Sequence, residues 1–394
     1  MASDSLSFDE ALAAVRAHEC RTELERVPVE QAAGRLLFQD VASPIDHPEF
    51  TNSAMDGYAV RSADLPGSLW LVGESRAGHP WEGSLEERKA LRISTGARLP
   101  KGADAILRLE DARESGGWVS TDEALQAGTH VRRQGEEVSI GDVVMHEGDL
   151  IRPHEVITLA ALGLAHVPCR RRVRVAIAGS GDELVRPGQP RAPGQVYDAN
   201  LPGLKVQVEA AGGVVVAMGS LPDDRGETER RLGEVLEAEG DGRPDLLVTT
   251  GGVSVGRHDH LRPALLSLGV EQVFWGVAIR PGHPLLLGSR GDQVVLALPG
   301  NPVSSMVCFR LFGRELLGLP LDATRMARLA EPYSATTTRT EFIRCRWRDD
   351  GLVPALRQGS HAIGDLAGAD ALGIVPAEVE ALSAGDAIQY VPLD

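Results

Sequence analysis

Apolar, strand-like runs alternate with helix-like segments between about Val173 and Pro320. The strand-like runs cover 173–178, 214–218, 246–250, 272–279 and 294–297, and the helix-like segments cover 200–211, 225–239, 261–268 and 303–317. Continuous apolar strands between helices are typical of parallel sheets, because such strands are buried on both faces. This part of the chain is therefore predicted to form a mostly parallel sheet with helices on both faces.

The segments before this alternation predict short helices around a β-rich module. Ser7 and Glu10 have the spacing of a capping box at the start of a helix, and a second short helix is expected between Pro28 and Gly34. From about His47 to Leu150, short apolar bursts alternate with turns, which predicts a β-rich module. Proline and glycine bracket a further helix from Pro153 to Gly163.

Two further parts of the chain, the apolar run 156–167 and the tail from about Met326, also predict structure. The longest apolar run, 156–167, is interpreted as a buried helix, and it is too short for the ~18 residues that a membrane span needs. The tail from about Met326 returns to short strands, of which 342–347 and 387–391 are the clearest, and it predicts a small β domain. A chain of 394 residues has room for such a multidomain arrangement.

The composition limits the partners and the compartment. Lysine and arginine number 40 and the acids 56, so the net charge of −16 gives no general attraction to nucleic acid or to anionic membranes. The four cysteines, Cys20, Cys169, Cys308 and Cys345, form no C-x-x-C pair, so neither a zinc knuckle nor a disulfide framework is indicated. The first ten residues lack the basic and apolar regions of a signal peptide. A cytoplasmic protein is expected.

Three glycine-containing loops follow predicted strands, at 179–183, 249–256 and 298–304. In an open parallel sheet, ligands bind beyond the carboxyl ends of the strands, where backbone N–H groups and hydroxyls can hold phosphate oxygens. Together the loops predict an anion pocket. The residues expected to contact the ligand are Gly179, Ser180, Gly181, Thr250, Gly251, Gly252, Ser254, Pro299, Gly300, Asn301, Pro302 and Ser304.

Each loop taken alone also has a simpler interpretation as a tight turn. The first loop is not a dinucleotide-binding fingerprint, because Leu184 stands where the third glycine belongs. The chain also contains no Walker A sequence. The sequence therefore disfavours a standard nucleotide-binding fold.

The second loop supports a rival hypothesis. Residues 252–256 fit the nucleophile elbow G-x-S-x-G of serine hydrolases, with Ser254 as the nucleophile. Asp292 and His361 follow in the order that a catalytic triad of this type requires. A serine hydrolase is thus an alternative, although His361 falls in the predicted C-terminal β domain.

Acidic residues near these loops are candidate ligands of a hard cation such as Mg²⁺. Asp259 follows the second loop, Glu183 lies in the first, and Asp223 or Asp224 precedes the next predicted helix. The simpler interpretation of Asp223 and Asp224 is helix capping. His258-Asp259-His260 looks like a metal cluster, but its two histidines are expected to face solvent.

Several ordered motifs resemble one known family, the molybdopterin molybdenumtransferases (MoeA and the gephyrin E domain). The stretch 48–60, PEFTNSAMDGYAV, resembles the signature loop of that family. The resemblance continues along the chain at 94–97, 102–105, 180–184, 196–200, 250–259, 280–282, 298–304 and 358–360. It covers almost the whole sequence and is therefore more specific than any single loop.

The resemblance implies a multidomain α/β and β architecture. Its parts are an elongated N-terminal domain (1–46 and 141–170), an inserted β-rich domain (47–140), a three-layer α/β molybdopterin-binding domain (171–322) and a C-terminal β domain (323–394). It also implies a homodimer with a shared active site, in which the inserted domain of one subunit faces the α/β cleft of the other.

The resemblance further implies the reaction, which is transfer of molybdate to adenylylated molybdopterin with release of AMP and Mg²⁺ as the cation. Glu183, Asp223 and Asp259 would bind the metal and act in cleavage of the pyrophosphate bond. Asp56 and Thr95 would reach in from the partner subunit, and Ser360 from the last domain. A molybdopterin adenylyltransferase would supply the substrate, and apo-molybdoenzymes would receive the product.

The basic side of the site departs from the family pattern. Many members carry lysines on the strand that leads to the Pro-Gly turn, whereas this chain has Gly276, Arg280 and His283. Arg280 keeps a cationic group, but arginine and lysine are not interchangeable, and histidine is mostly neutral at pH 7. A non-catalytic molybdopterin-binding paralogue therefore stands as the second alternative to the enzyme.

Overall fold

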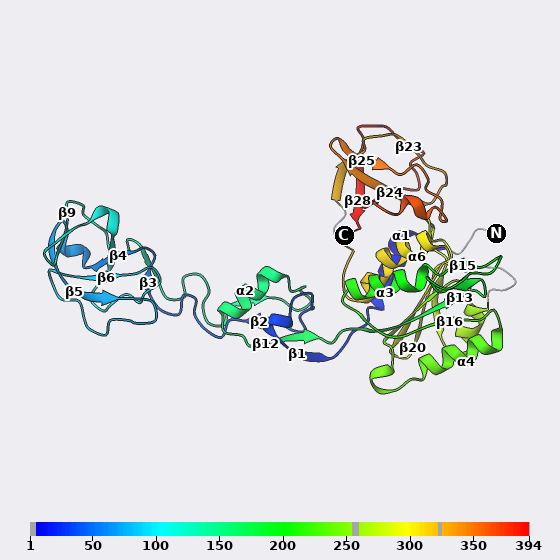
Figure 1. The fold of residues 1–394 in the computed structure, drawn as a ribbon, viewed down its shortest axis with the longest axis horizontal. Coiled ribbons are helices and arrows are strands. Elements are labelled where there is room, and N and C mark those ends of the chain that lie inside the picture. The colour runs from blue at the N-terminus through cyan, green and yellow to red at the C-terminus, as the bar shows by residue number, and fades with distance from the viewer. Residues whose placement is uncertain (1–4, 254–259, 322–324, 394) are drawn as a thin grey trace. The chain divides into compact units, whose positions relative to one another are not determined.

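The fold was analysed in a computed structural model, which describes residues 5–253, 260–321 and 325–393. Contacts divide the chain into two units, one of residues 1–24 with 170–394 and the other of residues 25–169 (Figure 1). No helix in the described ranges combines the length and the apolar character needed to cross a membrane.

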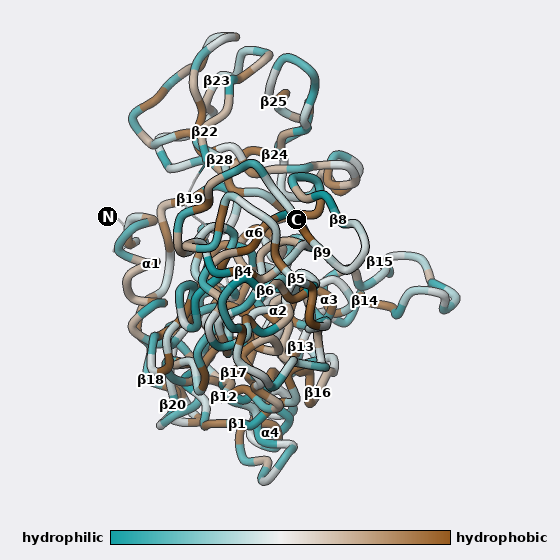
Figure 2. The backbone as a smooth tube through the Cα atoms, turned by 90° about the vertical axis from the view of Figure 1, so that its left-hand side faces the viewer, coloured by the Kyte–Doolittle hydropathy of each residue, from teal (hydrophilic) through white to brown (hydrophobic). Residues whose placement is uncertain are grey.

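The larger unit is built on a six-stranded sheet. The strands, in spatial order, are β16 (Val214–Leu221), β13 (Arg174–Ser180), β17 (Leu246–Thr250), β21 (Gln293–Leu298), β20 (Leu286–Arg290) and β18 (Glu271–Trp275). The first four are parallel to one another, and β20 and β18 are antiparallel to their neighbours. A short parallel pair, β14 (Leu184–Val185) and β15 (Val196–Tyr197), follows β13, and the connection between them is mainly hydrophilic (Figure 2).

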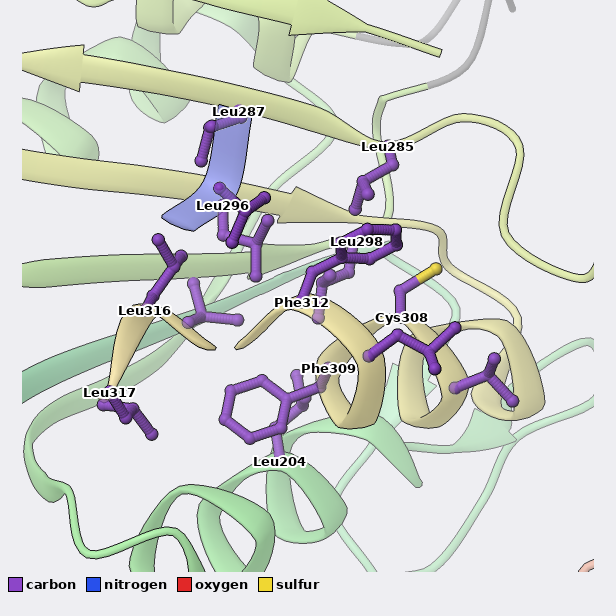
Figure 3. Close-up of a cluster of buried hydrophobic side chains, with 14 of the residues drawn as sticks. Leu204, Leu285, Leu287, Leu296, Leu298, Cys308, Phe309, Phe312, Leu316 and Leu317 are labelled. Atoms are coloured by element: carbon purple, nitrogen blue, oxygen red, sulfur yellow. The ribbon is translucent and has the colours of Figure 1, made fainter. Parts of the chain in front are cut away.

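Helices cover both faces of this sheet, which confirms the three-layer α/β prediction. One face carries α1 (Phe8–Ala17), α3 (Asn200–Ala210), α6 (Pro302–Cys308), the π-helical turn η5 (Phe309–Gly313) and α7 (Arg314–Leu316). The other face carries α4 (Arg225–Leu236) and α5 (Leu261–Ser267). Alternate residues of β13 explain the continuous apolar run, because Val175 and Ile177 join the first core and Ala176 and Ala178 the second. Figure 3 shows Phe309 of η5 close to Leu204 of α3.

The C-terminal part is a mixed β domain, as predicted. Its strands are β19 (Ile279–Arg280), β24 (Thr340–Arg348), β26 (Ala371–Val375), β28 (Ala387–Pro392) and β22 (Arg325–Arg328), with β25 (Gly351–Pro354) paired to β24. A separate pair joins β23 (Tyr333–Ser334) and β27 (Ala381–Leu382), and a 3₁₀ turn, η6, spans Ile363–Asp365. The strand β19 comes from the α/β part of the chain, so it carries Arg280 to the edge of this sheet.

The smaller unit contains a second six-stranded sheet. Its order is β7 (Ala105–Arg108), β4 (Gly57–Val60), β6 (Lys89–Ile93), β5 (Gly67–Ser75), β9 (Trp118–Thr121) and β8 (Arg113–Ser115). Both faces of this sheet are buried, one around Tyr58 and Leu107 and the other around Leu91 and Ile106. The remaining elements are β1 (Leu24–Pro28), β2 (Val41–Ala42), β3 (Asn52–Ser53), β10 (Val131–Arg132), β11 (Val143–Met145), α2 (Pro153–Ala161) and β12 (His166–Arg170).

Local predictions were partly right. The capping box forms, since the Ser7 N–H donates to Glu10 Oε2 (2.8 Å) and the Glu10 N–H to Ser7 Oγ (3.3 Å). The buried helix at 156–167 is wrong: α2 ends at Ala161, β12 begins at His166, and Ile157 is 71% exposed. Between Pro28 and Gly34 only the short 3₁₀ turn Val29–Gln31 forms.

Candidate active site

Three of the predicted loops meet at one edge of the large sheet. β13 and β21 both pair in parallel with β17, so the carboxyl ends of these three strands are neighbours. A cavity of about 490 Å³ lies there. It is lined by Ser180, Gly181, Glu183, Leu184, Asn200, Asp223, Gly251, Gly252, Val253, Pro284, Pro299, Gly300 and Asn301.

Asn200, at the start of α3, ties two of the loops together. Its Nδ2 donates to Thr250 Oγ1 (2.9 Å) and to the Gly300 carbonyl (2.7 Å). The Thr250 hydroxyl in turn donates to the Pro299 carbonyl (3.0 Å). Asn200 stands in one of the family-like motifs, but the sequence alone did not assign it to the site. Its amide fixes the cavity wall before any ligand binds.

Glycine is required where the loops approach most closely. Gly251 has a φ of +84°, and a Cβ there would lie 2.7 Å from the Ser180 carbonyl oxygen. A Cβ on Gly300 would come within 3.3 Å of the Gly251 Cα. The backbones of the three loops are therefore packed too tightly for side chains.

Gly251→Ala is expected to destabilise the protein more than the matched variant Gly188→Ala. Gly188 has nearly the same φ, +85°, but a Cβ there would meet open space. Both variants incur the left-handed backbone cost, and only Gly251→Ala adds overpacking of about 1–3 kcal/mol. Denaturant unfolding of both variants measures the difference, and equal losses of stability would show that the loop contact is not tight.

Two of the predicted metal ligands, Glu183 and Asp223, line the cavity. Asp223 is held against the first loop, because its carboxylate accepts long hydrogen bonds from Ser180 Oγ and from the Asp182 N–H (3.4 Å each). Its own N–H donates to Asp182 Oδ1 (3.2 Å). Asp224 instead caps α4 by accepting from the Glu227 N–H (2.9 Å), and of the two aspartates it is Asp223 that lines this cavity.

These carboxylates fit a hard divalent cation in the chemistry of their donors. Carboxylate oxygens are the ligands that Mg²⁺ prefers, and Glu183 and Asp223 share one polar cavity. Within the described ranges, no three acidic, histidine or cysteine side chains are grouped as a metal site. The predicted third ligand, Asp259, lies outside the described residues, as does Ser254.

Other predicted contact residues lie beside the cavity. Gly179 is within β13, where a Cβ would meet Leu201 at 3.3 Å. Ser304 is buried within α6, of which Pro302 is the first residue. None of these three residues is among those that line the cavity.

Ser360 joins the site through Asn301, whose Nδ2 donates to Ser360 Oγ (3.0 Å). The segment that carries Ser360 is held by Arg344, a fully buried residue on β24. Arg344 Nη2 donates to the carbonyls of Arg357 and Gly359. Among the described residues its Nε and Nη1 have no hydrogen-bond partner. Burial lowers the pKa of this guanidinium.

No motif in the sequence singles out Arg344. The available signal was one arginine inside the apolar run Phe342-Ile343-Arg344-Cys345, since buried charges are rare without a specific role.

The charge of Arg280 is partly compensated. Its Nη1 lies 3.2 Å from Oε1 of Glu341, a residue that is only 1% exposed. Glu341 also accepts hydrogen bonds from Tyr333 Oη (2.6 Å) and the Thr336 N–H (2.8 Å). Burial acts to raise the pKa of the Glu341 carboxyl, but these hydrogen bonds and the charge of Arg280 outweigh it and hold the pKa below its ordinary range.

The two other departures from the family pattern have structural correlates. Gly276 has a φ of +87°, so a side chain of any length would be strained there. His283 Nδ1 lies 2.9 Å from the Val277 carbonyl oxygen, which requires the proton on Nδ1 in the neutral ring. Neither position presents a fixed positive charge.

Asp56 and Thr95 lie together in the smaller unit. Asp56 precedes β4 and Thr95 follows β6, and these strands pair antiparallel with Gly57 opposite Ile93. The Thr95 N–H donates to Asp56 Oδ1 (2.8 Å), and both residues are exposed. A Cβ on Gly57 would lie 2.1 Å from the Leu107 carbonyl oxygen, which explains the glycine after Asp56.

The serine hydrolase hypothesis is wrong in its proposed acid. Asp292 precedes β21, whereas the loop with Ser254 follows the carboxyl end of the neighbouring parallel strand β17. The six residues of β21 therefore place Asp292 about 20 Å from that edge. Its carboxylate pairs with Arg243 instead.

Comparison with known proteins agrees with this architecture. Residues 6–163 match the model of the MoeA N-terminal region (domain I and II), residues 176–318 that of a probable molybdopterin binding domain, and residues 326–393 that of the MoeA C-terminal region (domain IV).

Whole-length relatives were also found. A molybdopterin molybdenumtransferase of Haemophilus influenzae is 34% identical over 389 residues, with 95% of each chain covered. Molybdopterin molybdenumtransferase 2 of Mycobacterium tuberculosis is 35% identical over 386 residues, covering 92% of this chain and 93% of its own. The crystal structure of a molybdopterin biosynthesis MoeA protein from Pyrococcus horikosii aligns with a TM-score of 0.83 and 29% identity, over 99% of this chain and 100% of its own. The chain belongs to the molybdopterin molybdenumtransferase (MoeA) family.

Proposed function

We propose that this protein is a molybdenum insertase, which transfers molybdate to adenylylated molybdopterin and releases AMP. The observation that carries the proposal is the cavity at the sheet edge, where glycine loops for phosphate adjoin the carboxylates Glu183 and Asp223. The family membership of the whole chain supports it. Pyrophosphate-linked substrates need both elements, because backbone N–H groups hold phosphate oxygens and a carboxylate-bound cation offsets their charge.

Each group in the cavity has a definite task in this reaction. Loop N–H groups and the Ser180 hydroxyl bind the phosphates, and Asn200 keeps two loops at a fixed separation. Glu183 and Asp223, together with Asp259, would hold Mg²⁺, which supplies charge neutralisation of the phosphate oxygens when bound. Water adds to the phosphorus of the adenylyl group, the bond to the molybdopterin phosphate breaks, and AMP leaves. The two sulfur atoms of molybdopterin form bonds to the molybdenum of molybdate, and one molybdate oxygen leaves as water with the two thiol protons. A carboxylate near this water accepts its proton.

We infer that the active form is a homodimer, in which Asp56 and Thr95 of one copy complete the cavity of the other. The Thr95 backbone N–H donates to the Asp56 carboxylate and holds that side chain beside Thr95, where β4 begins and β6 ends. Both residues are exposed, so they are available to a second copy. The substrate would come from a molybdopterin adenylyltransferase, and apo-molybdoenzymes would accept the product.

The proposed enzyme depends strongly on its cation. Arg280 is paired with Glu341, and Gly276 and His283 carry no fixed charge, so little basic charge from this segment reaches the cavity. Removal of Mg²⁺ is therefore expected to abolish AMP release rather than merely slow it.

The test supplies purified protein with adenylylated molybdopterin, molybdate and Mg²⁺. Stoichiometric AMP release and reconstitution of an apo-molybdoenzyme are expected, and both should stop in excess EDTA. Tight binding of the intermediate without AMP release would contradict the proposal and favour the binding-only paralogue. No covalent labelling of Ser254 by a fluorophosphonate is expected.

A further inference from the structure

An arginine run stands where the chain returns to the larger unit. The chain leaves this unit after Leu24 and re-enters it at Arg170, and the strands β1 and β12 at these two crossings pair with each other. Four of the five residues at 170–174 are arginines. Neighbouring like charges repel one another, so each of these side chains needs a partner of its own.

Arg171 joins both crossing segments to the large sheet. Its Nη1 and Nη2 donate to the two carboxylate oxygens of Asp245 (2.9 and 3.0 Å), the residue that precedes β17. Its Nε donates to Glu23 Oε1 (2.6 Å), in the segment that leaves the larger unit. The side chains of Arg171 and Asp245 are only 18% and 16% exposed, and a two-pronged arginine–carboxylate contact fixes geometry as well as charge. We refer to Arg171, Asp245 and Glu23 as the Arg171 clamp.

Backbone contacts reinforce the clamp. The Arg171 N–H donates to the Glu23 carbonyl (2.8 Å), and the Arg171 carbonyl accepts from Thr22 Oγ1 (2.6 Å). The Arg174 N–H donates to Asp245 Oδ2 (2.7 Å). The other arginines of the run also bind acceptors of the larger unit, which are Glu19 for Arg170, the Gly212 carbonyl for Arg172 and Asp241 for Arg174.

The clamp acts on the connection between the units rather than on the core of either one. Each unit has hydrophobic cores of its own, among them the two that flank the large sheet and the two that flank the inserted sheet. Two domains of one chain move relative to each other unless their connection or interface is restrained. The ion pairs at the crossings are such a restraint.

We propose that Arg171 is a positioning residue for the shared cleft: the clamp holds the crossing segments so that the smaller unit presents Asp56 and Thr95 to the cavity of a second copy. This inference rests on the proposed function. Because Asp56 serves the other copy, loss of the clamp in one copy impairs the cleft of the other copy and leaves its own cleft intact. An ordinary loss of stability instead affects the copy that carries the substitution, so the two roles are separable.

Mixed dimers distinguish the two roles. The Arg171→Gln homodimer is expected to release AMP about tenfold more slowly than the wild type, because a small misplacement of a reacting group is costly. Paired with Asp223→Asn, it should recover roughly half of the wild-type rate, since the cleft with Asp223 receives Asp56 from a copy whose clamp is intact. Paired with Asp56→Asn, it should stay as slow as the Arg171→Gln homodimer or slower. The reverse pattern, or no recovery in either pairing, overturns the proposal.

Two further variants control for charge and for the loss of an ion pair. Arg290→Gln removes an arginine of the larger unit that pairs with Glu237 (3.5 Å) and touches neither crossing, so the rate should stay within about twofold of wild type. Arg171→Lys keeps the charge but lacks the planar fork, so its rate should lie between those of wild type and Arg171→Gln. An equal loss of rate in Arg290→Gln would contradict a special role for the clamp.

A distance measurement tests the clamp without turnover. All four native cysteines are buried, so spin labels can be attached to cysteines introduced at two exposed positions, Glu271 in the larger unit and Glu123 in the smaller. Labelled protein is diluted with unlabelled protein, and the distance between the two labels of one copy is measured by pulsed electron paramagnetic resonance. Arg171→Gln should widen the distance distribution about twofold, and equal widths overturn the proposal. AMP release by the wild type with equal widths refutes the clamp alone, whereas a widened distribution without AMP release by the wild type refutes the function alone.

Discussion

Asp223→Asn is expected to lower the rate of AMP release by about 100-fold or more, because metal-assisted charge stabilisation contributes several kcal/mol to such reactions. Asp223 lines the cavity, and the substitution removes its charge while an amide oxygen can still accept from Ser180. The melting temperature should therefore change little. The rate is measured with saturating adenylylated molybdopterin, molybdate and Mg²⁺.

The adjacent aspartate provides a matched control. Asp224→Asn removes the same charge one residue away, but Asp224 caps α4 and asparagine is an equally good cap. Its rate should stay within about threefold of wild type, since an exposed charge outside the cavity contributes little. Similar rates for the two variants would remove Asp223 from the proposed site.

Glu341→Ala should lower the free energy of unfolding by about 3 kcal/mol, near the lower end of the effect of breaking a buried ion pair. Glu341 is 1% exposed and accepts hydrogen bonds from Tyr333 and Thr336, all of which would be lost. The lower end applies because the Arg280 side chain is 34% exposed and can be hydrated. Denaturant unfolding monitored by tryptophan fluorescence measures the loss.

Glu341→Gln removes the negative charge of the side chain but keeps its shape. Comparison of this variant with the wild type therefore tests how the charge of Glu341 makes stability depend on pH. Against the effect of burial, hydrogen bonds and Arg280 hold the pKa of Glu341 below its ordinary value of 4.5. The resulting stability is present above this value and is lost as the pH falls through the folded-state pKa. Wild type should therefore lose stability more steeply than Glu341→Gln on acidification below about pH 4.5. Parallel acid-unfolding curves would show that the ionised form is not preferred.

Most of the α/β fold could be predicted because its strands and helices have distinct apolar periods. The exceptions are local. The expected strand 272–279 is interrupted at Gly276, whose φ of +87° redirects the chain, so that β18 ends before it and β19 joins another sheet. The strand β20 was not predicted, because its short run, Leu286–Arg290, has no alternation of apolar and polar residues. It forms by antiparallel pairing with β21.

The candidate site also has features that the sequence predicts and features that it does not. The three loops were recognisable because glycine must stand where backbones approach, as Gly251 does beside Ser180. The Arg280–Glu341 pair was not, since its members are 61 positions apart and only the pairing of β19 with β24 brings them together. Arg344 likewise has no motif, and its position follows from burial in the C-terminal sheet. The four-domain division and the shared site stay predictions.

A heterodimer tests the shared cleft most directly. Asp56→Asn and Asp223→Asn subunits, each inactive as a homodimer, are co-expressed with different tags and the mixed dimer is isolated. If Asp56 acts in the cleft of the other subunit, one cleft of the mixed dimer carries both substitutions and the other carries none, so AMP release should recover to roughly half of the wild-type rate per dimer. A mixed dimer as inactive as either homodimer would contradict a cleft built from two subunits.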